Sequence, residues 1–286
     1  MTAFARLRRT AAFAAVTAAT ALALTACAFA GDAPAASGGA EGDLPTVTAG
    51  SLTIATGEPA FEPWVIGDDP SSGEGFESAV AYAVAEKLGF AKDDVVWVRS
   101  TFDSAIAPGA KDWDLNIQQF SVTDERKQAL DFSSPYYTTT QAVVTTAASP
   151  AASATSVAEL KDYTVGVMTA TTSYTVAEEQ LGADRLSVYN SNDDAVAALQ
   201  SGQVDAIVVD LPTAFYLAGA VLDDGKVVGQ FPDSSAGGDE LAFVLPKGSE
   251  LTSAVSDAVD ALREDGTLAE LEQTWLSDAV DVPVLS

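Results

Sequence analysis

The hydrophobic pattern from residue 52 onward alternates between short β-branched runs and longer amphipathic stretches. Phe76, Val80, Val84 and Leu88 are spaced by four and predict a helix that Gly89 ends. By the same reasoning we expect strands over residues 52–56, 95–98, 115–118, 164–167, 186–189 and 206–209. Further helices are expected over residues 102–107, 173–181, 192–201, 251–262 and 268–275, and one opens at residues 123–126.

The order of these elements predicts an α/β fold. Strands and helices alternate in two series, which favours two helix-covered, largely parallel sheets. Extended stretches at residues 139–145 and 241–245 are the expected crossovers between two lobes. Because open α/β sheets bind ligands at the carboxyl ends of their strands, the candidate site residues are those that follow each strand.

Composition excludes many kinds of site. The chain has 41 acidic and 14 basic residues, a formal net charge of −27, which disfavours nucleic acid as a partner. It has no histidine and one cysteine, so Ser-His-Asp and Cys-His catalytic sites, histidine metal sites and intrachain disulfides are excluded. We therefore expect no cofactor and no metal.

The first 26 residues have the pattern of an export signal. Three arginines at positions 6, 8 and 9 precede an apolar run over residues 11–26, and the run ends at Cys27. Residues 24–27, Leu-Thr-Ala-Cys, resemble the lipobox of bacterial lipoproteins, in which the cysteine carries the lipid. A membrane-spanning or uncleaved segment is the alternative, but the run is shorter than about 18 to 20 residues.

The segment after Cys27 is poor in bulky apolar residues. Residues 28–50 consist mostly of Ala, Gly, Ser, Pro, Asp and Glu, which predicts a flexible tether over residues 27–50. A lipid on Cys27 would hold the secreted protein at the outer face of the bacterial cell membrane.

Several motifs in the body occur in the order found in one known family. Residues 114–126 read DLNIQQFSVTDER and residues 130–137 read LDFSSPYY; VGV at 165–167, SGQVDA at 201–206, PKG at 246–248 and DGTL at 265–268 follow. This set, which extends over residues 52–275, resembles the family 3 solute-binding proteins of amino-acid ABC importers. The resemblance implies a two-lobed, type II periplasmic-binding-protein-like fold with two hinge crossovers. Residues 51–139 and 246–286 would form lobe 1, and residues 140–245 would form lobe 2.

The resemblance also implies a site for a free amino acid. Arg126 would bind the ligand carboxylate together with Thr171 and Thr172 at a helix N-terminus, where the helix dipole favours anions. In the absence of the resemblance, Arg126 reads as a solvated arginine and Thr172 as a helix cap. The chain has Ala170 where the family usually has glycine, and alanine tolerates positive φ poorly, so the turn before Thr171 is expected to differ in shape.

The ligand's ammonium group would be bound by Asp210, the Ser121 hydroxyl and Gln119, the last through its main-chain carbonyl. Asp210 also reads as the N-cap of a helix that starts at Leu211-Pro212.

The ligand's side chain is assigned by the resemblance to a pocket near Glu58. The Glu58 carboxylate favours polar or cationic amino acids, and aromatic residues would form the rest of the pocket: Phe61 and Phe102, with Trp64 and Phe76 as further candidates. Gln118 is expected to face away because it alternates with Gln119 on a strand. The alternative is that Glu58 is a solvated loop residue and that the aromatic residues belong to the core.

These inferences predict a binding protein, not an enzyme. Its partners would be a free amino acid, the permease and ATPase subunits of an ABC importer, and the membrane through the lipid anchor, with the protein itself a monomer. Two alternatives remain open. One is a prephenate or arogenate dehydratase on the same fold with Glu58 as general acid, and the other is an acidic surface lipoprotein without a small ligand.

Overall fold

The computed structural model describes residues 44–232, 238–276 and 282–286. The predicted signal segment, Cys27 and the tether up to residue 43 lie outside the described residues. The strands are β1 (Leu52–Thr56), β2 (Val95–Arg99), β3 (Leu115–Asn116), β4 (Leu130–Phe132), β5 (Tyr137–Thr139), β6 (Gln141–Thr146), β7 (Val165–Met168), β8 (Leu186–Tyr189), β9 (Ala206–Asp210), β10 (Gly225–Gln230), β11 (Asp239–Leu241) and β12 (Val244–Pro246). The α-helices are α1 (Phe76–Lys87), α2 (Phe102–Ile106), α3 (Val157–Leu160), α4 (Thr172–Leu181), α5 (Asn192–Gln200), α6 (Leu211–Tyr216), α7 (Thr252–Glu264) and α8 (Thr267–Trp275).

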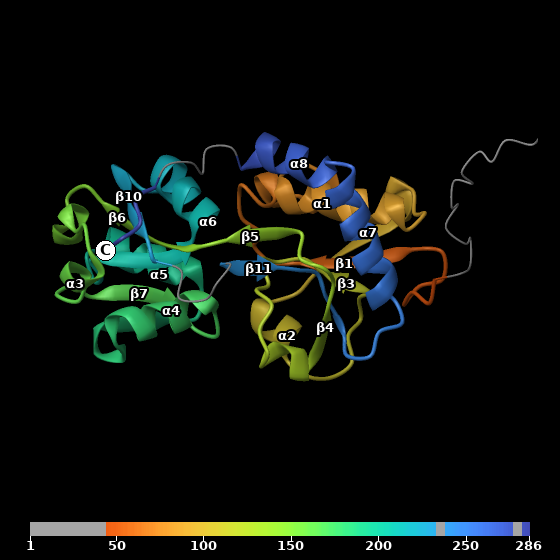
Figure 1. The fold of residues 1–286 in the computed structure, drawn as a ribbon, viewed down its shortest axis with the longest axis horizontal. Helices are drawn as coiled ribbons and strands as arrows, with labels where there is room; N and C mark the ends of the chain where they lie inside the picture. The colour runs from red at the N-terminus through yellow and green to blue at the C-terminus, as the bar shows by residue number, and fades with distance from the viewer. Residues whose placement is uncertain (1–43, 233–237, 277–281) are drawn as a thin grey trace, which may run out of the picture. The chain divides into compact units, whose positions relative to one another are not determined.

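The first sheet has the strand order β2-β1-β3-β12-β4. Strand β1 pairs in parallel with β2 and β3, whereas β12 runs antiparallel to β3 and β4. Helices α1, α7 and α8 cover one face, where the helix residues Val80, Val84 and Val259 pack against Ile54 and Leu115 of the sheet (Figure 1). The spacing by four that predicted α1 places Phe76, Val80 and Val84 in this core.

The second sheet has the order β10-β6-β9-β7-β8. Strands β7, β8 and β9 are parallel, as the sequence predicts, but β6 runs antiparallel to both of its neighbours, β9 and β10. Strand β10 therefore has the same direction as β7, β8 and β9, and the expectation of a largely parallel sheet is wrong at β6, which follows β5 with only Thr140 between them and no helix to turn the chain around. Leu160 of α3 and Leu181 of α4 are buried in one core of this sheet, and Leu199 of α5 is buried in another.

The chain passes between the two sheets at strands β5 and β11, which pair with each other antiparallel (Figure 1). Both expected crossovers, at residues 139–145 and 241–245, are therefore displaced, since β12 belongs to the first sheet. Residues 141–146 form β6 inside the second sheet, where their β-branched side chains are mostly buried, and the connecting strand comes just before them.

The last described residues pack on the second sheet. Leu285 is buried in that sheet's core, and the main chain of residues 283 and 285 is hydrogen-bonded to Gln230 of β10. Gly229 makes this possible, since a Cβ at that position would lie 2.8 Å from the Leu285 side chain. The prediction that residues 246–286 all belong to the first lobe is thus wrong for residues 282–286.

At the other end of the body, the Val47 N–H donates to Asp114 beside β3 of the first sheet.

The helix expected to open at residues 123–126 is only one turn of 3₁₀-helix, Arg126–Gln128, because the chain enters β4 at Leu130. Within the described residues, no helix combines the length and the apolar character needed to cross a bilayer.

Candidate functional site

A cavity of about 230 Å³ lies where loops of both sheets meet. The first sheet contributes residues of the loops after β1, β2 and β3. The second sheet contributes residues that follow β7 and β8 and the last two residues of β9. Nine of the residues that the sequence analysis assigned to the ligand line this cavity: Glu58, Phe61, Phe102, Gln119, Ser121, Arg126, Thr171, Thr172 and Asp210. The rule that ligands bind at the carboxyl ends of strands therefore locates this cavity correctly.

Arg126 connects the two sides of the cavity. Its Nη1 donates to the Ser121 carbonyl at 2.8 Å, and its Nη2 donates to the Ala170 carbonyl across the cleft at 2.9 Å. The guanidinium carbon lies 5.2 Å from the centre of the Phe102 ring, within cation–π range. A guanidinium has five N–H donors, so Arg126 keeps donors for an anion.

The N-terminus of α4 faces the same cavity. Thr171 is its N-cap, and the Thr171 hydroxyl accepts from the Tyr174 N–H at 3.1 Å. Ala170, just before the cap, has φ +59°, the left-handed conformation that alanine adopts at a cost of about 1 to 2 kcal/mol. The turn before Thr171 is therefore left-handed although it is made with alanine. The helix dipole and the Thr172 hydroxyl, which lies 3.1 Å from the Ser121 hydroxyl, make this end suitable for a carboxylate.

Asp210 faces the cavity from the end of β9 and is held by a buried amide. The Gln141 Nε2 donates to Asp210 at 2.8 Å and to Asp239 at 2.7 Å, while the Gln141 Oε1 accepts from the Ser173 hydroxyl at 2.6 Å. Burial, together with the charge of Asp239, raises the pKa of Asp210 to about 7. An ammonium group placed beside Asp210 would restore its charged form. The Asp210 side chain makes no cap hydrogen bond to α6.

Gln119 meets a buried carboxylate behind the cavity. The Gln119 N–H donates to the Glu77 Oε1 at 2.7 Å, and the Gln119 Nε2 and the Tyr136 hydroxyl also donate to Glu77. Burial raises the pKa of Glu77 to about 7. Sequence reasoning missed Glu77, Gln141 and Asp239. An acid in the first turn of a helix is usually solvated, and Gln141 and Asp239 begin short strands whose pairing has no sequence signal.

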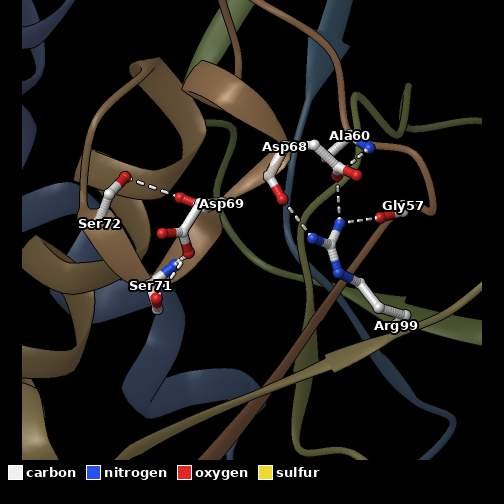
Figure 2. Close-up of polar contacts among 7 residues, drawn as sticks. All are labelled: Gly57, Ala60, Asp68, Asp69, Ser71, Ser72 and Arg99. Carbon is white, nitrogen blue, oxygen red and sulfur yellow. Dashed lines mark hydrogen bonds and ion pairs between the residues drawn. The ribbon is translucent and has the colours of Figure 1, made fainter.

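Glu58 and Phe61 line the cavity from the loop after β1. The Arg99 Nη1 donates to the Gly57 carbonyl of this loop at 2.6 Å and to the Asp68 carboxylate at 2.7 Å, and Asp68 also accepts from the Ala60 N–H at 2.8 Å (Figure 2). These contacts attach the loop to the end of β2 and to the turn at residue 68.

The other residues found at the cavity differ from those that the sequence analysis expected for the side-chain pocket. Gln118 lines the cavity, so the expectation that it faces away is wrong; strand β3 ends at Asn116 and its alternation does not reach Gln118. Trp64 and Phe76 are not lining residues but buried core residues with their rings edge to face. Asp193, which follows β8, lines the cavity with Glu58.

Comparisons with known proteins place this geometry in a family. Residues 52–278 match the model of the bacterial extracellular solute-binding proteins, family 3. The chain belongs to this family. The L-arginine-binding protein of Pseudomonas aeruginosa is 29% identical over 241 residues, which are 82% of this chain and 91% of that protein. The L-cystine-binding protein TcyJ of Escherichia coli is 28% identical over 76% of this chain and 80% of its own length.

Solved structures agree with this family assignment. An ancestral arginine-binding protein bound to glutamine matches with a TM-score of 0.66 and 29% identity, over 79% of this chain and 97% of that one. An ancestral amino acid-binding protein, a precursor of cyclohexadienyl dehydratase, matches with a TM-score of 0.64 and 29% identity over 79% and 95%. The family member described here thus has the two-lobed α/β fold of type II periplasmic binding proteins, as the sequence predicts.

Proposed function

We propose that this protein captures a free amino acid between its two lobes and delivers it to the permease and ATPase subunits of an ABC importer. One observation carries the proposal: Arg126 of the first lobe and Asp210 of the second line the same cavity. A zwitterion needs a cation for its carboxylate and an anion for its ammonium group, and this pair supplies both. The α4 N-terminus with Thr171 and Thr172 would assist Arg126, and Ser121 and Gln119 would assist Asp210.

Polar and cationic amino acids are the favoured ligands. Glu58 and Asp193 line the cavity in addition to Asp210, while Arg126 is the basic side chain among the described lining residues. Excess negative charge in the cavity favours a cationic side chain, and Phe61 and Phe102 would contact its aliphatic part. The names of the relatives, which include binding proteins for arginine, for histidine and for lysine, arginine and ornithine, support the same class.

A thermal-shift panel of the twenty amino acids tests the proposal. A ligand at 100 times its Kd stabilises the folded protein by about 2.7 kcal/mol, so its melting temperature rises by several degrees. We expect L-arginine, L-lysine, L-histidine or L-glutamine to give the largest shift. No shift with any amino acid would overturn the proposal and favour an acidic lipoprotein without a small ligand.

We propose a binding role and not catalysis, because the cavity has charge complementarity for a bound zwitterion on both lobes. Incubation of the protein with prephenate or arogenate should give no turnover. Product formation would support the dehydratase alternative with Glu58 as general acid.

We also propose that Cys27 is lipidated and holds the secreted protein, as a monomer, at the outer face of the cell membrane. Residues 24–27 match a lipobox, and Cys27 is the chain's one cysteine. Cys27→Ser should release the protein into the medium, and an unchanged membrane fraction would point to another anchor. A sedimentation mass of two chains would contradict the monomer.

A further inference from the structure

Glu77 is a buried carboxylate that the binding scheme above does not use. It is the second residue of α1, it has no exposed surface, and it is not among the residues that line the cavity. Burying a carboxylate is costly unless hydrogen bonds compensate, so its position requires an explanation.

The donors around Glu77 explain why this position holds an acid. The Gln119 N–H and the Tyr136 hydroxyl both donate to the Glu77 Oε1, and the Gln119 Nε2 donates to its Oε2. An ionised carboxylate is acceptor-only and satisfies all three donors at once. Two of the three belong to a single residue, so Glu77 binds both the main chain and the side chain of Gln119.

Gln119 has an unusual backbone at the edge of the cavity. Its φ is +48°, a left-handed value that a residue with a side chain keeps only when surrounding contacts require it. Both nitrogens of Gln119 donate to Glu77, and among the described residues none donates to the main-chain oxygen of Gln119. This oxygen is therefore a free acceptor on a residue that lines the cavity.

We propose that Glu77 is a positioning residue. It holds Gln119 in the left-handed conformation, so that the Gln119 carbonyl accepts a hydrogen bond from the ligand's ammonium group. The inference rests on the proposed function in that the ligand is an amino acid. Gln141 has the corresponding role in the second lobe, where it orients Asp210.

Two substitutions at Glu77 distinguish the loss of the hydrogen-bond acceptor from a change in side-chain packing. Glu77→Met fills a similar volume but accepts no hydrogen bond, so it leaves the Gln119 and Tyr136 donors without this acceptor and is expected to lower the stability of the fold. Glu77→Gln keeps an oxygen for the Gln119 N–H. Should Glu77→Met fail to fold, the double variant Glu77→Met/Tyr136→Phe also removes the unsatisfied tyrosine hydroxyl. Tyr136→Phe alone is the control, since it leaves both contacts to Gln119.

Crystal structures of the ligand-free proteins test the first half of the proposal. The left-handed Gln119 should persist in the wild type, in Glu77→Gln and in Tyr136→Phe, and it should be lost in Glu77→Met. A Gln119 that stays left-handed without the acceptor at position 77 would overturn the proposal, whatever the ligand is.

Calorimetry with two probes tests the second half. L-Arginine has the ammonium group and 5-guanidinopentanoate lacks it. Glu77→Met should weaken the binding of L-arginine by about 10- to 100-fold, which is the effect of losing a hydrogen bond to a charged group. Glu77→Gln should weaken it by less than about threefold. The affinity for 5-guanidinopentanoate should stay within about threefold of the wild type in both. An equal loss for the two probes would overturn the role at the ammonium group, whereas failure of wild-type protein to bind either probe would count against the proposed ligand class.

Discussion

The two ends of the cavity are built differently. At one end, the Gln141 side chain holds Asp210 in the second lobe and the Glu77 side chain holds Gln119 in the first. Gln141 is almost fully buried, and Glu77 is fully buried. At the other end, Glu58 lies on a loop that Arg99 and Asp68 hold at the surface, where both side chains are partly exposed (Figure 2). The groups that every amino acid shares would thus meet residues fixed by the core, while the variable side chain would meet a loop fixed by weaker surface contacts. Specificity can then change without disturbing the core.

Loss of Arg126 should have the largest effect, because it removes the cation that would bind the ligand's carboxylate. Removing one partner of a buried ion pair costs about 3 to 5 kcal/mol, so Arg126→Ala should weaken amino-acid binding by more than about 100-fold while the protein stays folded. Calorimetry measures this, with the exposed Arg185→Ala as control. A loss below tenfold would remove Arg126 from the carboxylate site.

Acidification should weaken amino-acid binding because it protonates Asp210. The pKa of Asp210 is raised to about 7 by burial and by the charge of Asp239, with Gln141 and Arg126 acting in the opposite direction. The ammonium group needs the ionised form, so affinity should fall about tenfold per pH unit below pH 7.

The free protein should respond to pH in the opposite direction. A carboxyl whose pKa is raised on folding contributes stability at low pH, and this contribution is lost as the pH rises through about 7. Asp210→Asn should flatten both profiles relative to the wild type. Glu77, whose pKa is also about 7, titrates in the same range and would contribute the remaining slope. A pH-independent Kd between pH 5 and 8 would contradict an ionised Asp210 at the ammonium group.

Glu58→Gln should change affinity by an amount that depends on the ligand's side chain. For L-arginine or L-lysine it removes a charge partner, and we expect a loss of roughly 1.5 to 3 kcal/mol; for L-glutamine the loss should be nearer 1 kcal/mol. Titrations of all three ligands give the comparison. Unchanged binding throughout would place Glu58 outside the side-chain pocket and remove its support for cationic ligands.

Arg99→Ala should have the smallest effect, because it acts on Glu58 only through the loop. Partly exposed ion pairs contribute about 0 to 1 kcal/mol, so the affinity ratio of L-arginine to L-glutamine should change by no more than about fivefold. Lys92→Ala, at a surface lysine that lies over the Tyr82 ring, is the matched control. A loss as large as that of Arg126→Ala would show that the loop end is as rigid as the other and would contradict the comparison.

The sequence predicts the regular elements well and the connections poorly. Helices α1, α4 and α5 and strands β1, β7, β8 and β9 follow from hydrophobic spacing and lie within one or two residues of their predicted bounds. Strands β5 and β11 have three residues each, too few for a periodic pattern to identify them, and their pairing depends on residues about 100 positions apart.

The residues of the candidate site also differ in whether the sequence predicts them. Arg126 and Asp210 follow from motifs that are contiguous in the sequence. Glu77 and Gln141 act through contacts 42 and 69 residues away, which no local pattern encodes. Gln118 was misplaced because strand alternation was extended beyond the last strand residue, Asn116.

The attachment of residues 282–286 to the second lobe has a practical consequence. Val47 lies beside the first sheet and Val284 pairs with Gln230 of the second, and both side chains are more than half exposed. Dyes attached to cysteines at these two positions, in a Cys27→Ser background, would be carried by different lobes. Energy transfer between them would report the relative motion of the lobes without a label near the cavity. The described chain therefore already has the layout of an optical sensor for the amino acid that it binds.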